Sequence, residues 1–301
     1  MEKILITGVS GFVGQVLAAR LNRNYEIIGV DLDKTASNLC NVFYNSDVTE
    51  SKSISEIVNT HLPSVIIHAA AIKDLLKCES EKERAYRTNT ESTINIYNLA
   101  KEIKSKFIFI SSDQVFGGGN AYSEPDSLKD PINYYGITKS AAEDAIFKEG
   151  ITAICRTALV FGNVPVNQLG LFADVKNRNT LGVQGFIVDH VRYRLSHGEG
   201  MFLSSEEYCN PTSAELLAKQ IHAVIKNKLS GIFHCCGGER ISRYDFGLRI
   251  AQVFGLNENL INPNPARDAL RPKDVSLSVV GTECALGFKF PMIDEMLRAL
   301  K

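Results

Sequence analysis

The sequence predicts an α/β protein built on a doubly wound parallel sheet. Short apolar stretches alternate with segments of helical periodicity through the first half of the chain. The apolar stretches are continuous, which is typical of strands buried on both faces of a sheet. A run of spaced glycines directly follows the first stretch. Strand and then helix, repeated several times, is the order found in doubly wound sheets covered by helices.

The expected elements follow one another regularly up to Gly162. Stretches rich in Ile, Val and Phe predict strands at residues 4–7, 26–30, 65–71, 107–111 and 151–157. Apolar residues at helical spacing predict helices at residues 11–22, 54–60, 81–104 and 135–149.

The second half of the chain is less regular. Residues 163–183 are polar and interrupted by glycines, so the first domain is expected to end its continuous course near there. Periodicity then predicts helices at 186–196, 213–226 and 244–254 and short strands at 201–204 and 231–236. We therefore expect a nucleotide-binding domain over residues 1–165, joined by part of 200–230, and a smaller C-terminal α/β substrate domain that takes most of 166–301.

The composition favours small-molecule partners. The formal net charge is −1, so the chain as a whole attracts neither nucleic acid nor an anionic membrane. No apolar run reaches the roughly 18 residues that cross a bilayer, and the first residues resemble a strand more than a signal peptide, so a cytoplasmic location is expected. The seven cysteines lack metal or redox spacing and are expected to be buried thiols. No metal site is predicted, and a homodimer is left open.

Three glycines mark the first candidate site. Gly8, Gly11 and Gly14 lie between the first strand and the first helix, where the backbone can approach a phosphate and helical N–H groups attract its charge. The second strand ends in Asp31, at the spacing where a carboxylate binds an adenosine ribose. Asp31, rather than its neighbour Asp33, would repel a 2′-phosphate. These features predict a Rossmann domain that binds NAD, and they disfavour NADP without excluding it.

Polar side chains at the end of a later strand mark the second site. The strand at 107–111 delivers Ser112 and Asp113 to the edge where open α/β sheets bind ligands. Tyr135 and Lys139 follow, four residues apart and hence on one face of a helix. Tyr97 and Lys101 have the same spacing, but no hydroxyl-bearing strand end precedes them. The sequence therefore favours Tyr135 over Tyr97.

These three groups suit the reduction of a ketone. Hydride addition to a carbonyl needs a proton on its oxygen, and a phenol can supply it when a nearby ammonium stabilises the phenolate. Tyr135 is the predicted acid and Lys139 the predicted ammonium. Ser112 would hydrogen-bond the same oxygen and hold it against the nicotinamide.

With these motifs in this order, the chain resembles the extended short-chain dehydrogenase/reductase superfamily over nearly its whole length. Within that superfamily it is most similar to the dTDP-4-dehydrorhamnose reductase family. The residues that carry the resemblance are His68 to Ala71, Asn89, Ile110 to Gly117, Tyr135 to Lys139, Arg156-Thr157, Phe161-Gly162, Asn210-Pro211-Thr212 and Arg271-Pro272.

The resemblance implies a role for many residues. Ser112, Tyr135 and Lys139 would form the catalytic trio, with Lys139 also on the nicotinamide ribose. The cofactor-binding residues would be Gly8, Ser10, Gly11, Phe12, Val13, Gly14, Asp31, Asp47, Val48, Ala69, Ala70, Ala71, Asn89, Ser111, Tyr135 and Lys139. Among them, Asp47 and Val48 would lie beside the adenine. The substrate-binding residues would be Asp113, Gln114, Phe116 and Arg271.

Two departures bear on the substrate. The similar reductases usually carry Tyr where Gln114 stands and Trp where Leu159 stands, and this chain has no Trp. Gln114 also replaces the glutamate of related 4,6-dehydratases, and an amide cannot titrate, which counts against dehydration. Asp113 is then expected to bind a substrate hydroxyl. Other basic residues of the expected substrate domain are predicted to be mostly solvated: Arg178, Arg192, Arg194 and Arg267.

The sequence thus predicts an NAD(P)H-dependent reductase of a 4-keto-6-deoxy nucleotide sugar, with Tyr135 as proton donor. A nucleotide-sugar epimerase would use the same trio and keep its NAD bound through each cycle. A third hypothesis is a non-catalytic regulatory subunit, because chains of this kind also serve that role. The intact trio argues against it.

Overall fold

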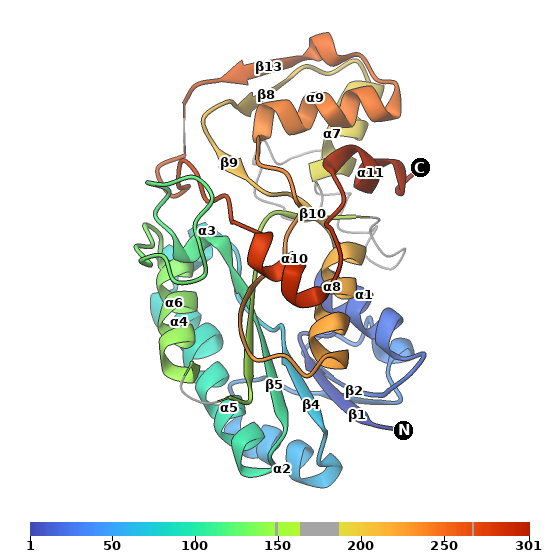
Figure 1. The fold of residues 1–301 in the computed structure, drawn as a ribbon, viewed down its shortest axis with the longest axis vertical. Helices are drawn as coiled ribbons and strands as arrows, with labels where there is room; N and C mark the ends of the chain where they lie inside the picture. The colour runs from blue at the N-terminus through green and yellow to red at the C-terminus, as the bar shows by residue number, and fades with distance from the viewer. Residues whose placement is uncertain (148–149, 163–186, 267) are drawn as a thin grey trace.

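The computed structural model describes residues 1–147, 150–162, 187–266 and 268–301. Its centre is a seven-stranded sheet with the order β11-β6-β5-β4-β1-β2-β3 (Figure 1). All neighbouring strands of this sheet are parallel, which confirms the predicted fold class. The strands are β1 (Lys3–Thr7), β2 (Glu26–Asp31), β3 (Val42–Asn45), β4 (Val65–His68), β5 (Lys106–Ser112), β6 (Thr152–Thr157) and β11 (Gly231–His234).

Alternate residues of each strand pack into two different cores, one on each face of the sheet. In β1, Ile4 and Ile6 face one core and Leu5 faces the other. Helices α1 (Phe12–Leu21) and α8 (Ala214–Lys226) cover the first face. The second face is covered by α2 (Ser51–His61), α5 (Ser92–Glu102) and α6 (Tyr134–Ile146). Burial on both faces explains why the strand residues are continuously apolar.

The helix predicted at 81–104 is divided. The chain forms α3 (Leu75–Ser80), α4 (Lys82–Tyr86), one π-helical segment, η2 (Arg87–Glu91), and then α5. The wider turn carries Asn89, which is buried against the loop after β4. The strand predicted at 65–71 ends at His68, because Gly8 packs against Ala70 and the chain leaves the sheet there. Helix α6 ends at Ile146, and Glu149 lies outside the described residues.

Residues from the second half complete the sheet. Strand β11 extends it beyond β6, and α8 packs against α1. Helix α8 lies within residues 200–230, part of which was expected to join the first domain, and β11 comes directly after this range. The edge strand β3 was not predicted, because three of its four residues are only half-buried, the fourth is exposed, and together they carry no clear apolar pattern.

The rest of the second half forms a smaller α/β unit near the carboxyl ends of the strands (Figure 1). β8 pairs with β13 in parallel, and β9 pairs with β12 antiparallel. Its elements are α7 (Ile187–Ser196), β8 (Met201–Ser204), β9 (Tyr208–Cys209), β12 (Ile241–Ser242), α9 (Arg243–Phe254), β13 (Ile261–Asn264) and α11 (Ile293–Arg298). The remaining elements are β7 (Val160–Phe161), β10 (Thr212–Ser213), α10 (Val280–Leu286) and the 3₁₀ turns η1 (Ser37–Leu39), η3 (Asp113–Val115) and η5 (Glu258–Leu260).

The prediction of seven buried thiols is wrong for two of them. Cys40 is half-buried, and Cys284 is exposed because Thr282 and Leu286 are the residues of α10 that turn to the core. Among the described residues, no helix is both long and apolar enough to cross a membrane.

Candidate active site

A cavity of about 1000 Å³, counting its open mouth, lies at the carboxyl ends of the strands. Its floor comes from the ends of β4, β5 and β6, one wall from α6, and the opposite wall from the second half of the chain. Ligands bind at this edge in open α/β sheets. The predicted trio of Ser112, Tyr135 and Lys139 lines it, together with Asp113 and Arg271.

The glycine turn beside this cavity depends on close backbone packing. Gly8 has φ +70°, and a Cβ there would lie 2.6 Å from the Ala70 nitrogen. A Cβ on Gly14 would collide with the Gly8 carbonyl oxygen. Gly11 is the N-cap of α1, and its N–H donates to the Gly8 carbonyl over 3.1 Å. The turn is therefore a cradle without side chains at the start of a helix, a geometry that fits a pyrophosphate.

Asp31 is held at the edge of this cradle. One carboxylate oxygen accepts the Ser10 backbone N–H over 2.9 Å, and the other accepts the Asp33 N–H over 3.1 Å. The Asp33 carboxylate accepts the Thr35 N–H over 2.8 Å within its own loop. Asp31 is thus the carboxylate placed beside the glycines. Ser10 also donates its hydroxyl to the Asp33 carbonyl.

The other expected cofactor residues continue along the same edge. Asp47 accepts the N–H and hydroxyl of Thr49, and Val48 beside it is buried. Neither lines the cavity, whereas Phe12, Val13, Ala69 and Ala71 do.

Helix α6 presents Tyr135 and Lys139 to the cavity. Asn133 caps the helix by accepting the Gly136 N–H over 2.8 Å, which puts Tyr135 in the first turn. Ser112, the last residue of β5, lines the same cavity as Tyr135. The Lys139 ammonium donates to the Ile110 carbonyl over 2.6 Å and lies 4.0 Å from the centre of the Phe109 ring. By contrast, the alternative tyrosine, Tyr97, packs in the core against Phe107.

Burial dominates the electrostatics of both groups. It raises the pKa of Tyr135 above its ordinary value, and the neighbouring Ser112 hydroxyl only partly opposes this. It lowers the pKa of Lys139 to about 7, against the opposing effect of Glu143. The lowering of the phenol pKa that was expected from Lys139 is therefore not found, because desolvation by burial is the largest effect on Tyr135.

Asp113 and Gln114 form the floor beside Ser112. The Asp113 carboxylate accepts the Ser112 hydroxyl over 3.0 Å, and burial raises its pKa to about 6. The Gln114 amide oxygen accepts from Asn133 over 2.9 Å, which leaves its NH₂ toward Asp113. Leu159 also lines the cavity, so both departures from the similar reductases lie at its surface.

The opposite wall contains two guanidinium groups. Arg243, the first residue of α9, pairs with Glu207 over 2.7 Å, and Arg271 lies 3.6 Å from Asp268. Both arginines line the cavity, and burial together with the charge of Arg243 lowers the pKa of Arg271. Two partly buried arginines in a cavity wall can bind an anion bidentately.

Sequence reasoning missed Arg243, Glu207 and Thr157. The first two reach the cavity through the pairing of β9 with β12, which no local pattern announces. Thr157 is paired in register with Ser112. Within the described part of the chain its buried hydroxyl has no hydrogen-bond partner, although it lines the cavity. The end of the strand predicted at 151–157 was the available signal.

Several predicted residues lie away from the cavity surface. Phe116 is not among the lining residues, and its ring lies 5.0 Å below the Arg156 guanidinium. Asn89 is a buried clamp that accepts from the Ile72 N–H over 2.8 Å and donates to the Thr138 hydroxyl over 3.0 Å. Ser111 lines the cavity with other atoms while its hydroxyl donates to Glu143.

The remaining candidate arginines do not reach this wall. Arg192 and Arg194 are on α7, where they pair with Asp189 and Glu199. Arg178 and Arg267 lie outside the described residues.

The parallel sheet, glycine cradle and Ser-Tyr-Lys cavity together define an extended short-chain dehydrogenase/reductase chain. Comparison with known families sharpens this class. Residues 1–300 match the family model described as RmlD substrate binding domain, and the chain belongs to that family.

Two curated relatives have different roles. The methionine adenosyltransferase 2 subunit beta of Rattus norvegicus is 24% identical over 281 residues, which cover 92% of this chain and 80% of the relative. The probable low-salt glycan biosynthesis reductase Agl14 of Haloferax volcanii is 26% identical over 304 residues, which cover 98% of this chain and 96% of the relative. This chain is thus similar both to a protein named as an enzyme subunit and to one named as a reductase.

Two solved structures have the same fold. A hypothetical dTDP-4-dehydrorhamnose reductase from Sulfolobus tokodaii has a TM-score of 0.80 and 31% identity, with 96% of both chains covered. A dTDP-4-dehydrorhamnose reductase from Bacillus anthracis, solved in complex with NADP, has a TM-score of 0.83 and 24% identity, with 99% of this chain and 97% of the other covered.

Proposed function

We propose that this chain is a nicotinamide-dependent reductase of a 4-keto-6-deoxy nucleotide sugar. The observation that carries the proposal is one cavity that holds both the Ser112, Tyr135 and Lys139 trio and the Arg243 and Arg271 pair. The trio suits ketone reduction, and the arginines suit a diphosphate. The reductase names of the Haloferax and Sulfolobus proteins agree with it.

The proposed mechanism divides the work between hydroxyl groups and an ammonium. The dinucleotide supplies a hydride when bound beside the glycine cradle. Tyr135 donates its proton to the carbonyl oxygen, and Ser112 hydrogen-bonds that oxygen, since both side chains line the same cavity. Lys139, now on the Ile110 carbonyl, would hold the nicotinamide ribose and offset the phenolate charge left on Tyr135.

The sugar would lie between the floor and the arginine wall. Asp113 accepts hydrogen bonds from sugar hydroxyls, and the Gln114 NH₂ donates to them. Arg243 and Arg271 bind the diphosphate. Leu159 lines the cavity where similar reductases usually carry an indole, so the sugar is to be identified by testing several nucleotide sugars.

Asp31 favours NADH over NADPH in this proposal, because its carboxylate would face a 2′-phosphate. The Bacillus anthracis protein bound NADP, so the preference needs a direct test. We expect wild-type protein to bind NADH more tightly, and Asp31→Asn to reduce the difference while keeping an acceptor for the Ser10 N–H. Equal dissociation constants for both cofactors in the wild type would contradict the preference.

The reaction is tested by NADH oxidation with dTDP- and UDP-linked 4-keto-6-deoxy sugars. Tyr135→Phe should lower kcat roughly 10²- to 10⁴-fold, the range for loss of a general acid, with the NADH dissociation constant unchanged. Tyr97→Phe, in the core, is the matched control. Undiminished turnover in Tyr135→Phe would disprove the mechanism. Cofactor that survives gel filtration without net NADH oxidation would instead indicate an epimerase.

A second candidate function is a regulatory subunit of another enzyme. It is favoured by the rat relative, which is named as a subunit and matches 92% of this chain. In this case tagged protein should co-purify with one stoichiometric enzyme, and no keto sugar should be reduced. If Tyr135→Phe binds the same partner as well as the wild type does, the trio is not used in this regulatory role.

A further inference from the structure

A buried ion pair lies directly behind the catalytic residues. Arg156 on β6 and Glu143 on α6 are each about 1% exposed. The Arg156 Nε and Nη2 atoms donate to the two Glu143 oxygens over 3.0 and 2.8 Å, which makes a bidentate fork. The Ser111 hydroxyl donates to the same carboxylate over 2.6 Å. Three elements, β5, β6 and α6, are therefore joined by one carboxylate.

Each member of this cluster is next to a residue of the cavity. Ser111 precedes Ser112, and its partner across the β5–β6 ladder is Arg156. Glu143 lies one helical turn after Lys139 and two turns after Tyr135. The ion pair thus sets the separation between the strand that carries Ser112 and the helix that carries the phenol and ammonium.

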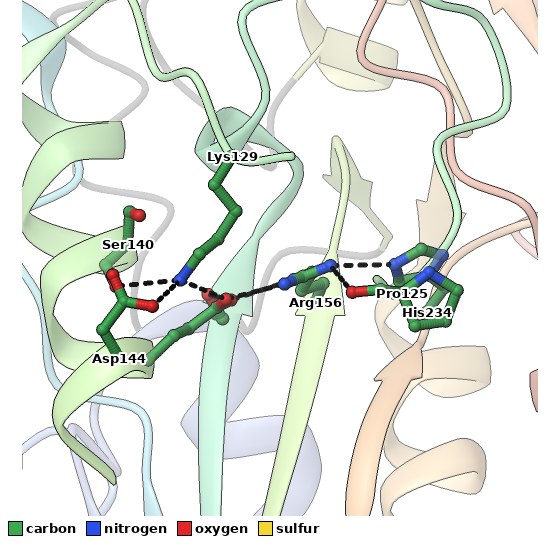
Figure 2. Close-up of polar contacts among 8 residues, drawn as sticks. Pro125, Lys129, Ser140, Asp144, Arg156 and His234 are labelled. Carbon is green, nitrogen blue, oxygen red and sulfur yellow. Dashed lines mark hydrogen bonds and ion pairs between the residues drawn. The ribbon is translucent and has the colours of Figure 1, made fainter. Parts of the chain in front are cut away.

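The same guanidinium also reaches the segment between β5 and α6. Arg156 Nη1 donates to the Pro125 carbonyl over 2.9 Å, and Lys129 lies 3.4 Å from Glu143 and also pairs with Asp144. Figure 2 shows Lys129 and Asp144 on one side of Arg156 and Pro125 on the other. This segment starts at the cavity floor and returns to the N-cap of α6.

The remaining Arg156 contact leads to the C-terminal part. His234 Nδ1 donates to the Ser278 carbonyl over 2.8 Å, so its Nε2 is free to accept from Arg156 Nη1 over 3.4 Å. Ser278 in turn donates its N–H to the Ser123 carbonyl over 2.9 Å. Through these hydrogen bonds, the Arg156–Glu143 ion pair connects the catalytic helix with chain on the substrate side.

Stability alone is a weak reason for such a pair. Apolar side chains of similar volume in place of a buried ion pair often leave stability unchanged or increase it. A bidentate fork, however, fixes direction as well as distance. We propose that Arg156 and Glu143 are positioning residues that hold Ser112 and Tyr135 in register for proton transfer, a role that rests on the function proposed above.

The double variant Arg156→Met/Glu143→Met tests this role without stranding a buried charge, and Lys129 keeps Asp144 and the Ser140 carbonyl. We expect a melting temperature near that of the wild type, an unchanged NADH dissociation constant and a kcat lowered roughly 10²-fold, the effect of a misplacement of about 1 Å. A kcat close to the wild-type value would overturn the proposal and leave the pair a merely structural role.

If the double variant does not fold, Arg156→Lys is used instead, because it keeps a buried positive charge opposite Glu143. It loses the fork, so kcat should fall roughly 10-fold while KM for the sugar nucleotide changes less, and wild-type kcat would overturn the proposal. The control is Arg249→Met/Asp294→Met, which removes a partly exposed 2.7 Å pair between α9 and α11, and it should leave kcat unchanged.

A separate readout distinguishes failure of the pair's role from failure of the proposed function. If wild-type protein reduces no keto sugar, the function is wrong, and the positioning is then measured in crystals with NADH. A Ser112–Tyr135 hydroxyl separation that grows by more than about 0.5 Å in the double variant supports the positioning role. An unchanged separation overturns it.

Discussion

The two ends of the candidate site are built in opposite ways. The cofactor end uses neighbouring residues, because Gly8, Gly14 and Asp31 belong to one strand-helix-strand unit. The sugar end takes its floor from β5 and its arginines from α9 and the loop before α10. A contiguous unit can be recognised from spacing alone. A wall assembled from distant segments depends on tertiary pairing, so its ligand must be tested chemically.

The largest effect is expected from breaking the cofactor end with Gly14→Ala. The added Cβ meets the Gly8 carbonyl, so the turn must open and the phosphate cradle is lost. NADH binding, measured by titration calorimetry, should disappear, and the melting temperature should fall. Gly281→Ala, with open space around its Cβ, is the control. Retained binding in Gly14→Ala would show that the cradle is not used.

A smaller effect is expected when the sugar end loses one guanidinium. Arg243→Met should raise KM for a nucleotide sugar about 10- to 100-fold, the value of one charge-assisted hydrogen bond, and leave kcat less affected. Glu207→Gln is introduced in the same chain to avoid an unpaired buried carboxylate, and Glu207→Gln alone is the control. The effect should weaken in salt. An unchanged KM would show that the diphosphate does not bind at this wall.

Because of Asp113, the free energy of unfolding of the chain should fall as the pH rises. Its folded pKa of about 6 lies above the ordinary value of 3.8, so the folded state holds the proton more tightly. Stability therefore falls between about pH 4 and 6 and stays lower above that range. Asp113→Asn should stabilise the chain by about 2–3 kcal/mol at pH 8 and by little at pH 4, measured by urea unfolding. Asp126→Asn, at an exposed position, should show no such trend.

The smallest effect is expected at Thr157, the unpaired hydroxyl between the two ends. A ligand that uses it would lose about 0.5–1.5 kcal/mol in Thr157→Val, which is a factor of roughly 2 to 10 in affinity. Thr157→Ser should restore the wild-type value. Separate titrations with cofactor and with nucleotide sugar would show which ligand contacts Thr157. An unchanged affinity for both ligands would show that neither uses its hydroxyl.

The sequence predicted the cofactor end of the site better than the sugar end. Continuous apolar strands predicted the sheet, and the order of glycines, Ser112 and Tyr135 predicted which residues share an edge. The split helix was missed because helical periodicity alone does not distinguish a short π-helical segment, Arg87–Glu91, from α-helix. Arg243 was missed because nothing in its surroundings differs from an exposed helix start until β12 pairs with β9.

The register of β5 and β6 has a consequence for how this protein can vary. Ser111 and Ser112 are consecutive, yet the Ser111 hydroxyl binds the ion pair and Ser112 lines the cavity, and Arg156 and Thr157 repeat this arrangement on the next strand. Because successive strand residues point to opposite faces, a one-residue deletion in either strand would exchange the two roles. Substitutions can retune this site, but insertions and deletions must stay in the loops that follow it.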